Sequence, residues 1–186
     1  PDGTWLDLGC GNGWLGHEWV QQNMPGSYVG LDFSAELLAE ARALNNHPAV
    51  SFRQADFMQA RWSEEMQDGI YQGAFCFAVL HHLPSFALRV DFLRQASALL
   101  EPGGWLWLSA WAFLREEKWR ERIQDWSLAG LSAADLEEGD YLLDWRQTQD
   151  GQPALRYVHS FSEGEWDRLF LESGWRAAER FDSDGE

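Results

Sequence analysis

The sequence predicts an α/β fold in which helices cover both faces of a doubly wound, mostly parallel sheet. Between residues 4 and 110, apolar runs of strand length alternate five times with segments of helical periodicity. The first run leads into a turn with four glycines in eight residues, and the run at residues 73–80 is apolar throughout, as is usual for a central parallel strand. We expect the 186 residues to form a single domain.

The expected elements follow one another in a regular order. Five strands are expected, at residues 4–8, 28–32, 50–55, 73–80 and 105–110. Helices are expected at residues 14–24, 35–44, 60–69 and 85–100. Ser34 is expected to cap the second helix, because a serine hydroxyl accepts a hydrogen bond from the free N–H groups at a helix start.

The regular alternation stops after the fifth strand. We expect residues 112–161 to form an insertion that acts as a lid on the substrate side of the sheet, with a charged helix at about residues 115–128. Insertions on the ligand side of such folds commonly carry substrate specificity. The α/β pattern then resumes with a helix at residues 162–172 and a last strand at residues 175–181.

The composition limits the function classes. A net charge of −16 and a pI near 4.5 disfavour unaided binding of nucleic acid, because an acidic surface repels phosphate groups. No apolar run is long enough to span a membrane. The isolated Cys10 and Cys76 indicate neither a disulfide framework nor a zinc site. We therefore expect a cytoplasmic protein without a metal centre.

The glycine-rich turn predicts a cofactor site. Residues 11–16 match the G-x-G-x-x-G pattern, so a nicotinamide or flavin nucleotide has to be considered. Asp7 stands just before the first glycine, and a carboxylate there offers nothing to a pyrophosphate but attracts a cationic ligand. S-adenosylmethionine carries an ammonium and a sulfonium and no phosphate. The turn therefore suits S-adenosylmethionine better than a dinucleotide.

Acidic residues also follow the second and third strands. Asp32 is placed to accept hydrogen bonds from both ribose hydroxyls of a nucleoside, and Asp56 to accept from an adenine amino group between the rings of Phe33 and Phe57. The predicted cofactor-binding residues are Asp7, Gly9, Cys10, Gly11, Asn12, Gly13, Asp32, Phe33, Asp56, Phe57 and Ala78.

Five motifs in order resemble those of the class I S-adenosylmethionine-dependent methyltransferases. They are Asp7-Leu-Gly-Cys-Gly-Asn-Gly13, Gly30-Leu-Asp32, Ala55-Asp56, Ala78-Val-Leu-His-His-Leu83 and Pro102-Gly-Gly104. The resemblance covers most of the chain. It implies a Rossmann-like fold, S-adenosylmethionine as cofactor, and methyl transfer as the reaction.

The histidines after the fourth strand are candidates for catalysis. The sulfonium is already an activated methyl donor, so alignment of donor and acceptor supplies most of the rate. A general base is useful only if the acceptor must lose a proton, and His81 and His82 are placed for that role. The alternative is that they only shape a loop or contact the substrate.

A narrower resemblance lies in the insertion. Residues 139–146 and 155–161 are similar to segments of the tRNA methyltransferases that esterify the carboxylate of 5-carboxymethyluridine at the wobble position. The resemblance implies that Arg146 and Arg156 hold the acceptor carboxylate, with Tyr157 and His159 as hydrogen-bonding or stacking partners. It also implies a small partner protein. Val158 departs from the family pattern, which has an aromatic residue there.

Two other functions stay open at this stage. The acidic composition favours a small-molecule O- or N-methyltransferase, and a non-catalytic scaffold could keep the cofactor pocket without turnover. The class also normally ends with an antiparallel strand, for which too few residues follow position 181. We expect this final antiparallel strand to be missing and the chain to be part of a longer protein.

Overall fold

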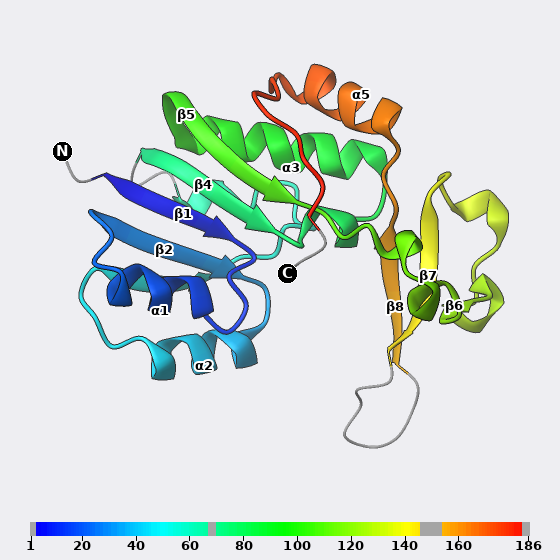
Figure 1. Ribbon diagram of the computed structural model, residues 1–186, viewed down its shortest axis with the longest axis horizontal. Coiled ribbons are helices and arrows are strands. Elements are labelled where there is room, and N and C mark those ends of the chain that lie inside the picture. Colours follow the sequence, from blue (N-terminus) through cyan, green and yellow to red (C-terminus); the bar gives the residue numbers. More distant parts are fainter. Residues whose placement is uncertain (1–2, 67–69, 146–153, 184–186) are drawn as a thin grey trace.

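A five-stranded parallel sheet forms the larger part of the computed structural model, which describes residues 3–66, 70–145 and 154–183 (Figure 1). Its strands lie in the order β3-β2-β1-β4-β5. They are β1 (Thr4–Leu8), β2 (Ser27–Asp32), β3 (Val50–Gln54), β4 (Tyr71–Phe77) and β5 (Leu100–Ser109). The helices around it are α1 (Trp14–Gln21), α2 (Ala35–Leu44), α3 (Phe86–Leu99) and α5 (Glu163–Ser173). The predicted α/β fold is confirmed.

Strand alternation divides the buried side chains between the two faces of the sheet. Leu6 and Leu31 belong to the cluster that includes the buried residues of α3, whereas Tyr28 belongs to the cluster beneath α1 and α2. Successive side chains of a strand point to opposite faces, so neighbours such as Tyr28 and Val29 serve different cores. Each large apolar side chain removed from water in this way contributes about 1.5–3 kcal/mol.

The order of the strands reverses between β1 and β4. β1 pairs with β2 on one side and with β4 on the other, and the chain crosses the sheet between β3 and β4. In open parallel sheets, ligands bind outside the carboxyl ends of the strands at such a reversal. The glycine turn after β1 and the segment after β4 therefore face the same ligand space.

The insertion forms a second, smaller sheet beyond the carboxyl ends of the main strands (Figure 1). It contains β6 (Ile123–Gln124), β7 (Asp140–Trp145) and β8 (Ala154–His159), all antiparallel. Phe113, Leu143 and Val158 are its buried centre. The small sheet thus has an apolar core of its own.

The expectation of a helix at residues 115–128 is wrong. Only the single turn α4 (Glu117–Arg120) is α-helical there, and β6 follows it. The Asp125 carboxylate accepts a hydrogen bond from the Ser127 N–H at 2.8 Å and starts a separate 3₁₀ turn. Pairing of β6 with β7 and this side-chain cap override the helical pattern. In the expected helix at residues 60–69, the described part contains only the 3₁₀ turn Glu64–Met66.

The expectation of a strand at residues 175–181 is also wrong. Gly174, at φ 82°, ends α5, and no strand forms between it and residue 183. The Trp175 indole N–H donates to the Leu93 carbonyl of α3 at 2.9 Å, and Arg180 pairs with Asp167 of α5 at 2.7 Å. These contacts hold the segment on the helices. Within the described residues, the main sheet therefore ends at β5 and contains no antiparallel strand.

In the part of the chain that the structure describes, no helix combines the length and apolarity needed to cross a membrane.

Candidate functional site

The glycine turn folds back over the end of β2. The N–H groups of Gly9 and Cys10 both donate to the Leu31 carbonyl at 2.8 Å. Gly9 has φ 87°, and a Cβ on it would lie 2.1 Å from the Val79 Cγ2 atom, so glycine is required there. Gly11 has φ 53°, but a Cβ on it would meet no atom within 4 Å. The backbone at Gly11 therefore borders open space at the carboxyl edge of the sheet.

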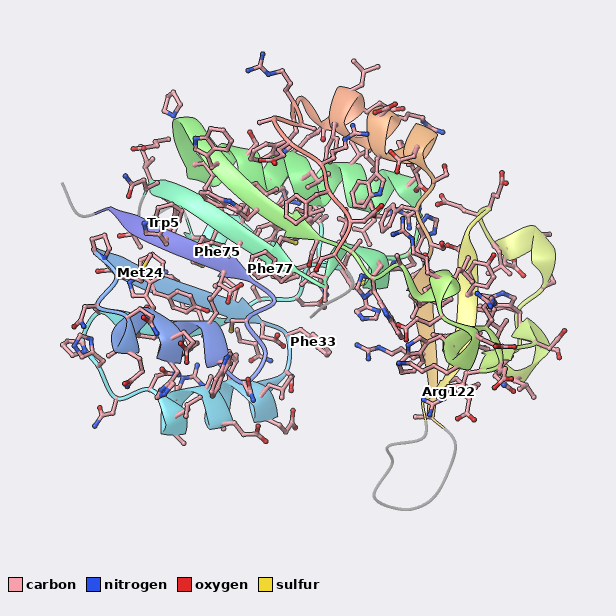
Figure 2. All side chains as sticks on the ribbon, in the orientation of Figure 1. Trp5, Met24, Phe33, Phe75, Phe77 and Arg122 are labelled. Carbon is pink, nitrogen blue, oxygen red and sulfur yellow. The ribbon has the colours of Figure 1, made fainter. Side chains whose placement is uncertain are left out.

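Asp32 is fixed by two backbone donors at the end of β2. Its Oδ2 atom accepts from the Gly11 N–H at 2.9 Å, and its Oδ1 atom accepts from the Ser34 N–H at 2.9 Å. A carboxylate has lone pairs for further donors, so Asp32 can hold the glycine turn and still accept ligand hydroxyls. Next to it, Phe33 is 68% exposed and projects from the carboxyl edge of the sheet (Figure 2).

Asp7 lies beneath the turn, where it is 4% exposed. The Tyr28 hydroxyl donates a hydrogen bond to its Oδ2 atom. Burial raises the pKa of Asp7 to about 6, the hydrogen bond from Tyr28 opposes this shift, and the charge of Asp32 adds to it. Asp7 can therefore act on a cofactor through its charge.

The other predicted cofactor residues have different surroundings. Asn12 is exposed, and Gly13 donates from its N–H to the Cys10 carbonyl at 3.0 Å. Cys10 is buried, which raises the pKa of its thiol. Asp56 is exposed after β3 and accepts from the Met58 N–H at 3.0 Å.

Phe57 packs into the core. Its ring centroid lies 4.9 Å from that of Trp62 and 5.1 Å from that of Phe92, both with edge-to-face geometry. With 6% of its surface exposed, Phe57 is a core residue on the α3 side of the sheet. Its contact with an adenine stays a prediction.

The backbone after β4 makes a strained turn. Ala78 has φ 59°, which is unusual for a residue with a Cβ, and its N–H donates to the Ser109 carbonyl at 3.1 Å. The 3₁₀ turn Leu80–His82 follows immediately. This geometry brings the end of β4, the end of β5 and the two histidines together.

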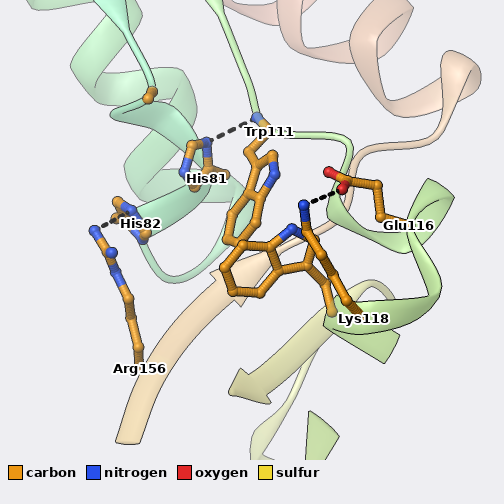
Figure 3. Close-up of a pocket in the computed structure, with 8 residues that line it drawn as sticks. His81, His82, Trp111, Glu116, Lys118 and Arg156 are labelled. Atoms are coloured by element: carbon orange, nitrogen blue, oxygen red, sulfur yellow. Dashed lines mark hydrogen bonds and ion pairs between the residues drawn. The ribbon is translucent and has the colours of Figure 1, made fainter. Parts of the chain in front are cut away.

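A pocket of about 350 Å³ lies between this turn and the insertion (Figure 3). Its lining comes from the segments after β4 and β5, from α4 and from β8: Ala78, His81, His82, Trp111, Glu116, Lys118, Trp119 and Arg156. Trp111 and Trp119 meet edge to face with ring centroids 4.5 Å apart. Lys118 pairs with Glu116. The pocket thus offers aromatic walls and cations to an acceptor.

His81 is almost completely buried at the inner end of this pocket. Its Nδ1 atom accepts the Trp111 backbone N–H at 3.1 Å. Burial lowers the pKa of His81 to about 3, and the nearby charges of His82 and Arg156 lower it further. The ring is therefore neutral at neutral pH, and its basic nitrogen is already in use.

His82 is hydrogen-bonded through both ring nitrogens. Its Nδ1 atom lies 3.1 Å from the Tyr157 carbonyl oxygen, and its Nε2 atom lies 2.8 Å from Arg156 Nη2 (Figure 3). Burial, followed by the charge of Arg156, lowers the pKa of His82 to about 4. The pocket thus brings together four of the predicted site residues: Ala78, His81, His82 and Arg156.

A second cluster ties the insertion to the helices. We call it the anchoring network: Arg89, Glu137, Asp140, Tyr157, His159 and Glu165. The fully buried Arg89 of α3 donates to Glu137 Oε2 at 2.7 Å and to Glu165 Oε1 at 3.2 Å. The ring nitrogens of His159 lie 2.7 Å from Asp140 Oδ1 and 2.8 Å from Glu165 Oε2.

This network includes two residues that were expected to contact the acceptor. The Tyr157 hydroxyl donates to Asp140 Oδ1 at 2.6 Å, and His159 is completely buried. Neither side chain is among those that line the pocket. Both anchor β8, and their contact with an acceptor stays a prediction. The expected role of Arg146 falls outside the described residues.

Several residues of the site were not predicted. Arg89 occupies the apolar stripe of α3, three residues after Phe86 and four before Leu93, and a charge on a buried helix face is the signal that could have revealed it. The side chains of Trp111, Glu116, Lys118 and Trp119 meet only through the fold of the insertion. Among the described residues, no group of three or more His, Cys, Asp or Glu side chains could hold a metal ion.

Comparisons with known proteins give a consistent picture. The family described as a methyltransferase domain matches residues 1–179. A malonyl-(acyl-carrier protein) O-methyltransferase of Halalkalibacterium halodurans is 27% identical over 160 residues, which are 83% of this chain and 56% of that protein. A tRNA (carboxymethyluridine(34)-5-O)-methyltransferase of Arabidopsis thaliana is 29% identical over 112 residues, which are 60% of this chain and 25% of that protein. The chain spans about half the length of the curated relatives that it matches first.

Solved structures share the fold. A methyltransferase in complex with the Haloferax volcanii Trm112 methyltransferase activator superposes with a TM-score of 0.61 at 19% identity, over 93% of this chain and 60% of that chain. CalS10, an amino pentose methyltransferase of Micromonospora echinaspora with S-adenosylmethionine bound, gives a TM-score of 0.59 at 20% identity, over 93% of this chain and 75% of that chain.

Proposed function

The chain belongs to the methyltransferase-domain family, and on this premise we propose that it transfers the methyl group of S-adenosylmethionine to a carboxylate carried by a flat heterocycle. The acceptor that fits best is the 5-carboxymethyl group of a tRNA wobble uridine. The observation that carries the proposal is the pocket beyond β4, which presents Arg156 between the tryptophan walls and two neutral histidines.

The carboxyl edge of the sheet suits this cofactor. Gly11 leaves room for a ligand against the backbone, and Asp32 is oriented to accept hydroxyl hydrogen bonds. The exposed ring of Phe33 can cover a flat base. The buried charge of Asp7 favours a cation at this edge. When bound, the cofactor supplies an activated methyl group, and the chain has to hold donor and acceptor in line.

The chemistry of the pocket favours an acceptor that is already ionised. A carboxylate needs no base, and the lowered pKa values of His81 and His82 make them poor bases at neutral pH. A guanidinium binds a carboxylate through two parallel hydrogen bonds, which suits Arg156. Trp111 and Trp119 line the pocket and can contact a base that has been turned out of its stack.

A small protein partner is part of this proposal. The net charge of −16 opposes binding of tRNA by the chain alone, and a partner can supply the missing cations. The fold neighbour from Haloferax volcanii forms a complex with the Trm112 methyltransferase activator. We therefore expect tRNA binding to need a second protein.

The leading alternative is a small-molecule carboxylate O-methyltransferase. The same pocket would serve it, the acidic surface would not oppose it, and the H. halodurans relative is an O-methyltransferase that matches 83% of this chain. A cofactor-binding scaffold without turnover is the remaining alternative. N-methylation fits less well, because an amine acceptor must lose a proton and both histidines are poor bases.

The test uses the full chain and a labelled methyl donor. Calorimetric titration with S-adenosylmethionine, and with NADH as control, measures cofactor binding. Transfer is then measured to tRNA carrying 5-carboxymethyluridine, to the same tRNA without the carboxymethyl group, and to free carboxylate nucleosides, each with and without a small activator protein. We expect label only on the carboxymethylated acceptors, as a base-labile ester. Cofactor binding without transfer to any carboxylate would contradict the proposed acceptor, and binding of NADH alone would contradict methyl transfer.

A further inference from the structure

We propose that His82 is a positioning residue that aims the Arg156 guanidinium at the acceptor, and that it does not transfer a proton. The proposal rests on the proposed function, because it assigns a role within the acceptor pocket. Its structural basis is the pair of hydrogen bonds that His82 makes to neighbouring residues of β8.

The partners of His82 select one form of its ring. A carbonyl oxygen can only accept, so the Nδ1 atom, 3.1 Å from the Tyr157 carbonyl, must carry the proton. A guanidinium can only donate, so the Nε2 atom, 2.8 Å from Arg156 Nη2, must present its lone pair. Both contacts are satisfied only by the neutral Nδ1–H tautomer. In this form His82 has no lone pair left for the proton of an acceptor.

The carbonyl that selects this tautomer is itself fixed. The side chain of Tyr157 donates to Asp140 Oδ1 at 2.6 Å and accepts from Arg89 Nη1 at 3.2 Å. Both bonds belong to the anchoring network, which fastens β8 to α3 and α5. Arg156 and Tyr157 are neighbours on β8, so their side chains point to opposite sides of the strand. The network therefore holds one side of β8, while His82 and Arg156 meet on the pocket side.

The groups that face His82 agree with this role. On its own turn, the His81 ring lies 4.2 Å away, centroid to centroid. Arg156 approaches from β8, and the Lys118–Glu116 pair lines the opposite part of the pocket. The carboxylate of Glu116 is already paired with Lys118. Burial and the charge of Arg156 disfavour a charge on His82, and the hydrogen bond to the Tyr157 carbonyl opposes them. Its pKa, lowered to about 4, keeps the ring neutral over the range in which methyl transfer is assayed.

Two matched substitutions separate positioning from proton transfer. The amide oxygen of His82→Gln can take the place of Nε2 and accept from Arg156, whereas the amide of His82→Asn can reach only the Nδ1 position. Neither amide can take up a proton. For positioning, we expect His82→Gln to keep the acceptor KM within about 3-fold of wild type and His82→Asn to raise it about 10- to 100-fold, as for loss of a hydrogen bond to a charged group. Proton transfer instead predicts that both lower kcat about 100- to 10,000-fold with little change in KM. That result would overturn the proposal.

The tautomer of His82 can also be measured directly, on the wild-type chain and without an acceptor. Nitrogen-15 NMR of the histidine rings distinguishes the Nδ1–H from the Nε2–H tautomer, and we expect His82 to show Nδ1–H between pH 6 and 8. Arg156→Met should shift the Nε2 resonance and raise the pKa of His82. An Nε2–H tautomer in the wild type would refute the positioning role even if methyl transfer is confirmed. Absence of transfer to carboxylates, with the Nδ1–H tautomer present, would instead refute the proposed acceptor.

Discussion

The Tyr28 hydroxyl donates a hydrogen bond to the Asp7 carboxylate in the core directly beneath the glycine turn. Both side chains are almost completely buried, and they come from adjacent strands, β1 and β2. One hydrogen bond does not replace the hydration that the carboxylate loses, and burial therefore raises the pKa of Asp7 to about 6. Burial therefore destabilises the ionised Asp7 carboxylate, and this carboxylate lies where a cationic cofactor is proposed to bind.

Asp7→Asn should make the protein more stable at neutral pH. The native pKa of Asp7, about 6, lies above its ordinary value of 3.8, so the native state binds this proton more tightly than the unfolded state does. The resulting stability is complete below pH 4 and is lost as the pH rises through 6. Urea unfolding at pH 7.5 should therefore give the variant a free energy of unfolding higher by up to about 3 kcal/mol. Near pH 4 the two proteins should be alike, and S-adenosylmethionine should bind the variant more weakly. Lower stability of the variant at pH 7.5 would contradict this reading of Asp7.

The main sheet was predictable because its signals are local. The apolar runs that became β1, β2 and β4 are continuous, and the turn after β1 needs glycines whose backbone angles no other residue adopts easily. Asp32 was predictable as a strand-end acid, although its hydrogen bonds to Gly11 and Ser34 were not. Such contacts depend on how the turn folds back, which a strand-and-helix pattern does not contain.

The insertion was less predictable because its order comes from distant contacts. β6 has two residues and exists only through its pairing with Leu142 and Leu143 of β7. Tyr157 and His159, which were expected to contact the acceptor, also bind Asp140 and the helices, and the sequence pattern did not predict these bonds. A single arginine on the buried side of α3 organises that cluster, and its partners Glu137 and Glu165 lie 48 and 76 positions away.

Alanine substitutions at three glycines should distinguish a loss of stability caused by backbone strain from a loss of cofactor affinity. Gly130 and Gly11 both have positive φ and no atom within 4 Å of an added Cβ, so each substitution should cost about 1–2 kcal/mol of stability. Gly9→Ala should cost clearly more, because its Cβ would also collide with Val79. Thermal unfolding measures all three. In calorimetric titration, only Gly11→Ala of the two milder variants should weaken S-adenosylmethionine binding. Equal cofactor affinity of Gly11→Ala and Gly130→Ala would remove the glycine turn from the proposed site.

Asp32→Ala should weaken cofactor binding by about 1–3 kcal/mol, because hydrogen bonds from ribose hydroxyls to a charged carboxylate are lost. It also removes the acceptors of the Gly11 and Ser34 N–H groups, so a loss of stability is expected as well. Asp125→Ala is the matched control, because Asp125 is exposed in the insertion and also accepts a backbone N–H, that of Ser127, at 2.8 Å. Calorimetry at a temperature well below unfolding compares the affinities. Unchanged affinity of Asp32→Ala would exclude this residue as a cofactor ligand.

Arg89→Met should destabilise the protein by about 3–5 kcal/mol, because Glu165, whose side chain is only 16% exposed, loses its buried ion-pair partner. The pair with Glu137, which is 41% exposed, adds little to this loss. Arg89 is completely buried and donates to Leu83, Tyr157, Glu137 and Glu165. Arg168→Ala is the matched control: the Arg168 side chain is 62% exposed and pairs with Glu172 at 2.9 Å, so its loss should cost less than about 1 kcal/mol. Urea unfolding gives both values. Arg89→Met should also speed proteolysis within residues 123–159, because the network fastens β8 to the helices. Equal stability of the two variants would show that the network does not hold the insertion in place.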